Sequence, residues 1–316
     1  MTSHTGTGTV AEQGRTEGAG IMDATEKPRL HRRRPFEYAA WAVCALVAIG
    51  LTYTLTTNEN FEWPVVRQYL TAPTVLAGLR LTIVLTVLAM FFGAVLGMVI
   101  AVMRASTVRP VRLLASGYIA FFRGTPVLVQ LIFWFNIAAL YPNIAVGIPF
   151  TGVSQVVDVN ALISATTAAV IGLSLNEAAY LAEIFRGGFA SVDKGQIEAA
   201  DSLGMSARTR LLRVVIPQSM PTVIPATGNQ VIGMFKGTSL VSVLGVAELL
   251  QSTQLIYART YQTIPLLIVA CLWYLIMTLL LSYPQSLIEK RYSLVKSRVS
   301  NEPAPVDPLP LGSEAR

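Results

Sequence analysis

The chain has 316 residues, of which 53% are hydrophobic and 13% are charged, and its mean hydropathy is +0.55. A soluble globular domain carries about 25% charged residues, so this composition excludes an ordinary soluble protein. The formal net charge of +6 does not indicate nucleic-acid binding, because the lysines and arginines lie in short runs beside apolar segments. The sequence therefore predicts a membrane protein that binds no nucleic acid.

The sequence offers few residues for catalysis or metal binding. His4 and His31 lie in the polar N-terminal region, and Cys44 and Cys271 lie within apolar segments without a CxxC or histidine cluster beside them. The phosphate-binding pattern G-x-x-x-x-G-K-[ST] does not occur. We therefore expect no enzyme activity, no metal site and no cofactor bound by this chain.

Six apolar segments are long enough to cross a hydrocarbon core as helices, which takes about 20 residues each. They are expected at about 38–55, 73–103, 124–140, 161–185, 219–242 and 264–286. The predicted fold class is an all-α integral membrane protein with six transmembrane helices. Residues 1–35 are expected to form a disordered basic tail, residues 36–292 the transmembrane domain, and residues 293–316 a second disordered tail.

Lysine and arginine mark alternate loops, and such loops are retained on the cytoplasmic side during insertion. The loops near 57–72, 141–160 and 250–263 contain only Arg67 and Arg259. The other side carries the runs at 27–34, 104–112, 186–213 and 290–298. This asymmetry predicts that both termini are cytoplasmic.

Gly93 and Gly97 form a GxxxG pattern in the second expected span. Such a pattern lets two helices approach closely, because no side chain separates their backbones. We favour packing against another helix of the same chain over a subunit interface.

The longest loop on the predicted cytoplasmic side, 186–221, has the signals of two short helices. Residues 196–203 are good helix formers, and Gly204 stands where a C′ glycine ends a helix. Ser206 can cap a second helix, which Pro217 helps to end. The loop is therefore expected to form a compact helix–turn–helix knob.

The same loop carries a string of residues that resembles the EAA loop of ABC importer permeases. In that family the loop is the coupling helix that docks on the ATPase subunit. The alternative is an ordinary helical hairpin in which the EAA triplet occurs by chance. The residues that match the pattern, and that the resemblance assigns to ATPase coupling, are Gly195, Glu198, Ala199, Ala200, Gly204, Ile216 and Pro217.

Three further motifs narrow the resemblance to permeases for polar amino acids such as histidine, glutamine, glutamate and arginine. The resemblance covers about residues 70–290 and implies a type I importer (MetI-like) permease fold. The motifs are the family signature Arg123, Gly124, Thr125 and Pro126 with the following VLVQ, the segment NEAAYLAEIFR from Asn176, and KGTSL from Lys236.

The resemblance also implies partners and a location. The partners are two ATPase subunits that bind ATP and Mg²⁺, a second permease that is identical or a paralogue, and an extracytoplasmic solute-binding protein. The substrate is an amino acid, and the location is the plasma membrane.

Several polar residues within the expected spans are candidates for substrate binding. An uncompensated carboxylate at bilayer depth costs about 2.5 to 3.5 kcal/mol, so Glu177 and Glu183 need partners or water. Either one of them meets the α-amino group of the substrate, or Glu183 pairs with Arg186 while Glu177 bonds within the bundle. The candidates are Asn176, Glu177, Tyr180, Glu183, Lys236, Thr238 and Ser239.

The sequence also suggests individual roles for Lys236, Arg123 and Pro126. Lys236 can snorkel, pair with a glutamate or meet a substrate carboxylate. Arg123 is expected at the cytoplasmic start of the third span as an interfacial or structural anchor. Pro126 is expected to break that span and leave carbonyls that protein or water must satisfy.

Other classes of membrane protein remain as alternatives. In an ion-coupled secondary amino-acid transporter, Glu177 and Glu183 would be the coupling sites, and uptake would not need ATP. A membrane enzyme would need a catalytic cluster that the sequence lacks. The secondary transporter would give the 186–221 loop no role. In a channel or structural bundle, replacing Glu198 or Gly204 would have little specific effect on ATPase association. The identity of the amino acid and the pairing of subunits stay open.

Overall fold

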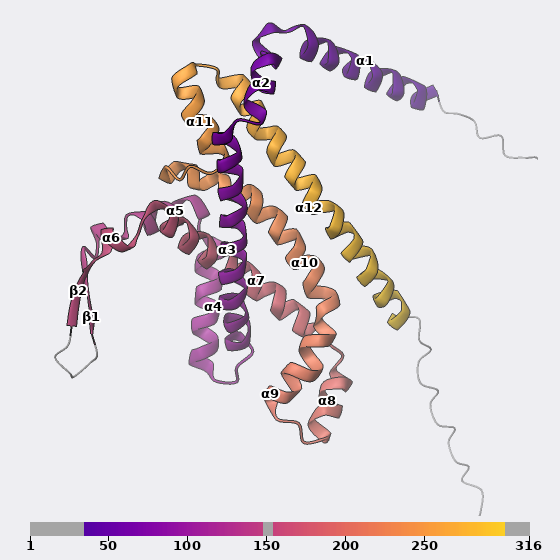
Figure 1. The fold of residues 1–316 in the computed structure, drawn as a ribbon. Helices are drawn as coiled ribbons and strands as arrows, with labels where there is room; N and C mark the ends of the chain where they lie inside the picture. The colour runs from indigo at the N-terminus through magenta and orange to yellow at the C-terminus, as the bar shows by residue number, and fades with distance from the viewer. Residues whose placement is uncertain (1–34, 148–153, 301–316) are drawn as a thin grey trace, which may run out of the picture. The chain divides into compact units, whose positions relative to one another are not determined.

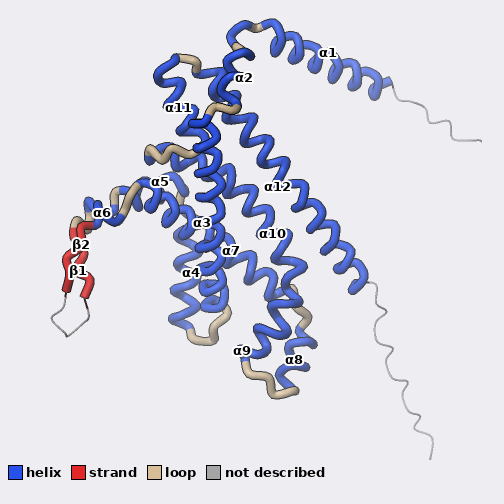
Figure 2. The backbone as a smooth tube through the Cα atoms, in the orientation of Figure 1, coloured by secondary structure: helices blue, strands red, loops and turns tan. Residues whose placement is uncertain are grey.

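The computed structural model describes residues 35–147 and 154–300, and helices dominate it (Figures 1 and 2). The chain divides into two compact units, with the boundary after Glu59. The first unit contains α1 (Pro35–Thr57), an apolar helix long enough to cross a membrane. The expected tail at 1–34 lies outside the described residues.

The second unit contains the rest of the described fold. In chain order its elements are η1 (Glu59–Phe61, across the boundary), α2 (Trp63–Leu70), α3 (Pro73–Arg104), α4 (Arg109–Gly124), α5 (Val127–Phe135), η2 (Ile137–Ala139), β1 (Asn143–Gly147), β2 (Ser154–Asp158), α6 (Val159–Leu162), α7 (Ala165–Ala190), α8 (Lys194–Ser202), α9 (Ala207–Arg210), the π-helical turn η3 (Leu211–Val215), α10 (Ile216–Gly237), η4 (Thr238–Leu244), α11 (Leu249–Thr260) and α12 (Thr263–Ser300).

Four helices, α1, α3, α7 and α12, are each long and apolar enough to span a membrane. Two further segments are bent. α4 and α5 meet at 102°, and the segment 207–244 meets α11 at 44°. The six expected spans are obtained when each bent pair is counted as one.

The third span differs from the prediction of a helix at 124–140. Helix α4 begins at Arg109, and the chain turns at Pro126, which precedes the first residue of α5. The sequence pattern missed α4 because this helix is amphipathic: Ala115, Ile119 and Phe122 are buried on one face, while charged residues lower its mean hydropathy. The turn at Pro126 was expected.

Three smaller features also differ from the prediction. The expected loop at 141–160 contains an antiparallel pair of strands, β1 and β2, in which Asn143 pairs with Asp158. The expected loop at 250–263 is largely helical, since α11 lies there. Residues 293–300, assigned to a disordered tail, are the last residues of α12. Residues 301–316 lie outside the described part of the chain.

Helices α3 and α7 pack closely through the two glycines of the GxxxG pattern. A Cβ on Gly93 would lie 3.1 Å from the Cβ of Glu177, and a Cβ on Gly97 would lie 2.9 Å from the carbonyl oxygen of Ala178. Small residues on α7, such as Ala178 and Ala182, are fully buried. The expectation that these glycines serve packing within the chain is confirmed.

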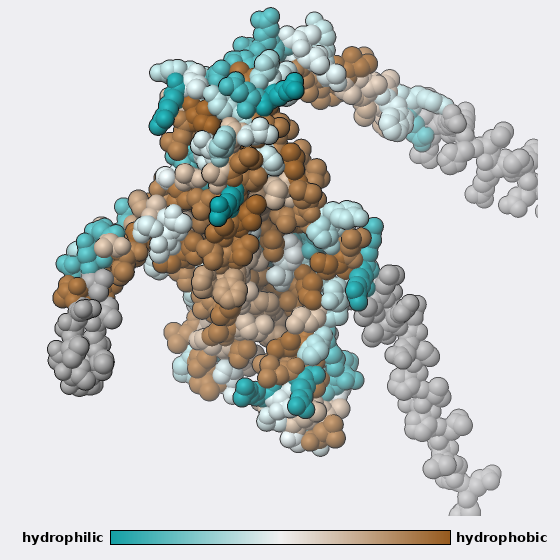
Figure 3. Space-filling model, in the orientation of Figure 1, coloured by the Kyte–Doolittle hydropathy of each residue, from teal (hydrophilic) through white to brown (hydrophobic). Residues whose placement is uncertain are grey.

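The surface of the second unit is apolar along the middle of its long helices and polar near α2 and α11 and near α8 and α9 (Figure 3). Large apolar side chains on α3, such as Phe91 and Val95, are more than half exposed. A broad apolar surface of this kind suits contact with lipid.

Candidate functional site

A polar cavity of about 210 Å³ lies between α5, α7, α10 and η4. Helix α7 contributes Asn176, Glu177 and Tyr180, all three predicted as substrate residues, and α10 contributes Gln230. The other lining residues are apolar or glycine: Val127, Leu173, Gly233, Met234, Gly237 and Leu240. Glu177 is the one ionisable carboxylate in this lining.

Glu177 is 5% exposed, and its Oε1 accepts a hydrogen bond of 3.1 Å from the side-chain amide of Gln230. Gly93 makes room for its aliphatic stem, because any side chain there would crowd it. Among the described residues Glu177 forms no ion pair. A carboxylate held by one neutral donor at the edge of a cavity is available to a cationic ligand.

The sequence did not indicate Gln230. The sequence shows only an amide side chain within an apolar helix. Its role is recognised from the structure, in which this amide bonds to Glu177. The residue connects α10 to the acid of the cavity.

Asn176 lines the cavity but also supports the bend at Pro126. Its Nδ2 donates to the carbonyl of Phe122 at 3.0 Å and to Oε1 of Gln130 at 3.1 Å. The Nε2 of Gln130 donates to the carbonyls of Phe122 and Thr125 at 3.0 and 3.1 Å. Protein groups therefore satisfy the carbonyls that the proline leaves unpaired, as expected from the sequence. The Nδ2 of Asn176 is used by the fold, so its carbonyl oxygen is the atom left for a ligand.

Glu183 is not in the lining of the polar cavity. It forms ion pairs with Arg104 at 2.5 Å and with Arg186 at 2.8 Å. The second of the two interpretations expected the contact with Arg186, while the contact with Arg104 joins the end of α3 to α7. Its role as a substrate ligand therefore has no support in this geometry.

The three candidates at the junction of α10 and η4 are also absent from the lining. Thr238 is fully buried, and its hydroxyl donates to the carbonyl of Phe235 at 2.7 Å. The Ser239 hydroxyl donates to the carbonyl of Lys236 at 2.8 Å. The Lys236 side chain is exposed and forms no ion pair within the part of the chain that the structure describes. Gly237, between them, does line the cavity.

Arg123 lies in the last turn of α4, about 21 Å along the helix from Arg109. Its expected position at the start of the span is therefore wrong, because the span begins with α4. The guanidinium carbon lies 5.2 Å from the centroid of the Tyr180 ring. Arg123 does not line the cavity itself but contacts Tyr180, which does.

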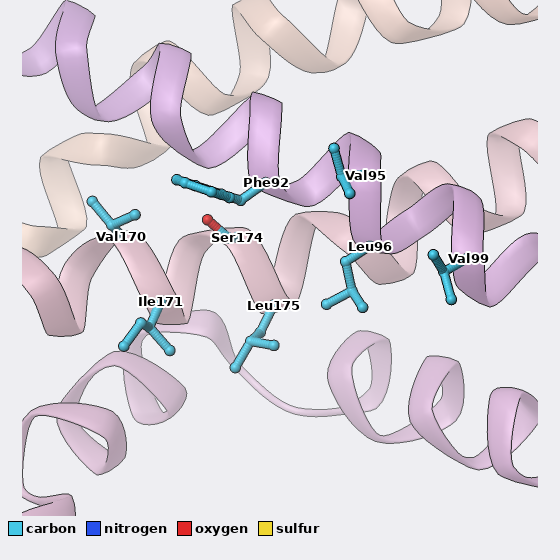
Figure 4. A pocket seen from close by; sticks show the side chains of 8 residues that line it. All are labelled: Phe92, Val95, Leu96, Val99, Val170, Ile171, Ser174 and Leu175. Atoms are coloured by element: carbon cyan, nitrogen blue, oxygen red, sulfur yellow. The ribbon is translucent and has the colours of Figure 1, made fainter.

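A larger hollow of about 430 Å³ lies between α3 and α7 (Figure 4). Ser174 supplies its one hydroxyl, which is buried and has no hydrogen-bond partner among the described residues. The other lining residues are apolar: Phe92, Val95, Leu96, Val99, Val170, Ile171 and Leu175. This hollow does not suit a charged solute, because it offers nothing to pair with a charge.

The knob predicted at 186–221 is formed by α8 and α9. Asp193 caps α8 by accepting from the backbone N–H of Gly195 at 2.7 Å, and Ser206 caps α9. Gly204 has a φ of +70°, the left-handed conformation expected of a C′ glycine. Asp201 forms an ion pair with Arg210 across the turn. The helix–turn–helix prediction is confirmed.

Pro217 does not end the second helix of the knob. The chain continues through η3 into α10, and Pro217 lies in the first turn of α10. A π-helical turn already interrupts the regular hydrogen-bond ladder, so the missing N–H of the proline does not stop the helix. The knob and the cavity wall are therefore parts of one helical segment.

Comparison with known families agrees with this arrangement. The family described as "Binding-protein-dependent transport system inner membrane component" matches residues 93–294. The chain belongs to this family. The permease is therefore a component of a transport system, not an enzyme, and lies in the inner membrane.

Relatives of the permease are similar over most of its length. It is 37% identical to the arginine transport system permease protein ArgU of Corynebacterium glutamicum over 286 residues, 89% of each chain. It is 38% identical to the L-cystine transport system permease protein TcyB of Bacillus subtilis, over 75% of this chain and 94% of that protein.

Solved structures share the fold of the permease. A crystal structure of an amino acid ABC transporter with histidines is 40% identical, has a TM-score of 0.58, and matches over 69% of this chain and 94% of that chain. The MetNI methionine ABC transporter in an inward-facing conformation has a TM-score of 0.52 at 17% identity, over 69% and 95% of the two chains. The second likeness supports the MetI-like fold alone.

Proposed function

We propose that the permease is the membrane-spanning subunit of an ABC importer for polar amino acids. The observation that carries the proposal is the cavity at Glu177, a buried carboxylate that has one amide donor and no ion pair within the described residues. The relatives named for arginine and cystine transport support the same substrate class.

The substrate's α-ammonium group is the natural partner for Glu177. A carboxylate inside a membrane protein is stabilised by a cation and by hydrogen bonds. Glu177 has few partners in the empty site, so it gains more stabilisation from a bound ammonium group than a fully paired acid would. The ion-coupled transporter would use the same acid for a proton or a metal ion, and membership of a family of binding-protein-dependent systems favours the ATP-driven alternative.

We further propose that the knob of α8 and α9 faces the cytoplasm and docks on the ATPase. Glu198, Ala199 and Leu203 are exposed on this knob, while Ala200 is buried. An exposed leucine beside small residues suits a helix that lies in a partner's groove. The partner ATPase would bind ATP and Mg²⁺.

Helix α10 provides a direct path from the knob to the cavity. It begins at Ile216 beside η3 and carries Gln230 about 21 Å further along its axis. A displacement of the knob therefore reaches the amide that holds Glu177. We propose that ATP-driven movement of the knob opens and closes the cavity in this way. A second permease, identical or a paralogue, and an extracytoplasmic solute-binding protein complete the assembly that the family leads us to expect.

The test is uptake by the complete transporter in proteoliposomes. We expect uptake of radiolabelled arginine to require ATP, and Glu177→Gln to abolish it while leaving assembly with the ATPase unchanged. Glu289→Gln is the matched control, because Glu289 is exposed on α12 and is bonded by Asn229 and Gln285 away from the cavity. Uptake that continues without ATP and follows an ion gradient would show that the permease is a secondary transporter.

A further inference from the structure

The cavity lining offers a partner for the α-ammonium group of an amino acid but no charged partner for its α-carboxylate. Glu177 can meet an ammonium group, but the lining residues include no lysine, arginine or histidine. A zwitterionic substrate also brings a carboxylate, whose burial without a cation or several donors is costly. A positively charged group close to the lining is therefore needed if the proposed function, on which this inference rests, is correct.

Arg123 is a cation whose side chain contacts a residue of the lining. Its guanidinium lies 5.2 Å from the ring centroid of Tyr180, and Tyr180 lines the cavity. Tyr180 follows Glu177 by one helical turn on α7, so the two side chains share a face. A contact with a ring face uses the charge of a guanidinium but none of its N–H groups as hydrogen-bond donors to oxygen. Those N–H groups are free to bind a carboxylate beside the ring.

Arg123 forms no ion pair within the described residues. Its charge acts on Glu183 from a distance, but that carboxylate, three residues after Tyr180, is bonded to Arg104 and Arg186. Glu183 is thus bonded to two arginines, and Arg123 lies beside the cavity without an ion pair among the described residues.

The backbone that carries Arg123 is fixed in position. The carbonyl of Phe122, the preceding residue, accepts from both Asn176 and Gln130, and the carbonyl of Thr125 accepts from Gln130. A binding group needs such support, because a freely moving side chain loses conformational entropy when it binds.

We propose that Arg123 binds the α-carboxylate of the substrate while Glu177 binds the α-ammonium group. Arg123 is then the residue that restricts the permease to amino acids and rejects the corresponding amines. An arginine suits this role because its planar group binds both carboxylate oxygens at once. Lys236 is the competing candidate, since it is exposed beside Gly237 of the lining, but within the described residues it forms neither an ion pair nor a cation–π contact.

The experiment measures equilibrium binding to the purified permease–ATPase complex in nanodiscs, without the solute-binding protein. The probes are L-arginine, L-glutamine and the two amines that remain when each loses its carboxylate, agmatine and 4-aminobutanamide. The variants are Arg123→Gln, Arg123→Lys and Lys236→Gln. The matched control is Arg112→Gln, an exposed arginine on the same helix.

We expect Arg123→Gln to weaken binding of the amino acids by about 10- to 100-fold, the usual range for a charged hydrogen-bonded contact. Binding of the two amines should not change, so the preference for amino acids disappears. Arg123→Lys should recover part of the preference, and Arg112→Gln should match the unaltered complex.

Other outcomes overturn the proposal. An equal loss for amino acids and amines in Arg123→Gln would show that Arg123 only supports the fold. Loss of the preference in Lys236→Gln alone would assign the carboxylate to Lys236. An unaltered complex that binds none of the four probes, or that binds them equally well after Glu177→Gln, would contradict the proposed function itself.

Discussion

The side-chain amide of Asn176 on α7 donates to the backbone carbonyl of Phe122 at the end of α4, with 3.0 Å between nitrogen and oxygen. Pro126 bends the chain there, and a carbonyl freed by such a bend within a membrane must find a donor. Asn176 therefore has two functions at once: it lines the cavity and it holds the corner that carries Arg123.

Replacing Asn176 with leucine should destabilise the permease. The change removes one of the two donors to the Phe122 carbonyl and leaves Oε1 of Gln130 without its partner, at a cost of about 1 to 3 kcal/mol. Thermal unfolding in detergent measures the effect. Asn136→Leu is the control, because the Asn136 amide is exposed and bonds within its own helical turn. Equal melting temperatures for the two variants would contradict the structural role of Asn176.

The close contact of α3 and α7 predicts a difference between two glycines. Gly97→Ala should destabilise the permease by about 1 to 3 kcal/mol, because its Cβ would lie 2.9 Å from a backbone oxygen that cannot move aside. Gly117→Ala on α4 meets nothing within 4 Å and should be neutral or stabilising, since alanine favours helix. Yield and thermal unfolding compare the two. If both alanines behave alike, the glycines of α3 do not set the helix spacing.

Several features of the fold could be predicted from the sequence, and the reasons differ. The spans α3 and α7 follow from long apolar segments, and the knob follows from Gly204 and the capping residues, whose signals are local. Helix α4 was missed because its buried face is narrow and because Arg109, Arg112 and Arg123 lower its mean hydropathy. The position of Arg123 was wrong as a consequence.

Partnerships across the bundle could not be predicted. The pairing of Glu177 with Gln230 joins residues 53 positions apart, and no periodicity in either helix indicates it. The sequence pattern did not single out Glu248, which is fully buried. Only the packing of α3, α11 and α12 around it shows that it is buried.

The left-handed backbone at Gly204 predicts a coupling defect. Gly204→Ala places a Cβ at a φ of +70°, which costs about 1 to 2 kcal/mol and loosens the turn between α8 and α9. We expect less ATPase subunit to copurify and ATP-dependent uptake to fall, while the spans still insert. Gly187→Ala is the control near the knob, since a Cβ there meets nothing within 4 Å. Unchanged ATPase binding in the Gly204 variant would contradict the docking role of the knob.

The contacts of Glu248, which precedes the first residue of α11, lead to a prediction about stability. It is fully buried, and its Oε2 accepts from Tyr274 of α12 at 2.9 Å and from Thr82 of α3 at 3.3 Å. Its two oxygens also cap α11 by accepting from the N–H groups of Leu250 and Gln251. One side chain thus joins three helices.

Removing either hydroxyl should therefore weaken the bundle. Tyr274→Phe leaves the buried carboxylate less satisfied, and Thr82→Val also leaves the backbone N–H of Leu249 without its acceptor. We expect Tyr274→Phe and Thr82→Val each to lower stability by about 1 to 3 kcal/mol. The two together should differ from the sum of the single effects, because both donate to the same oxygen. Thermal unfolding of the single and double variants measures this coupling. Tyr283→Phe, at a tyrosine that is 70% exposed on α12, is the control. Strictly additive effects would show that Glu248 does not act as the common acceptor that joins α3 to α12.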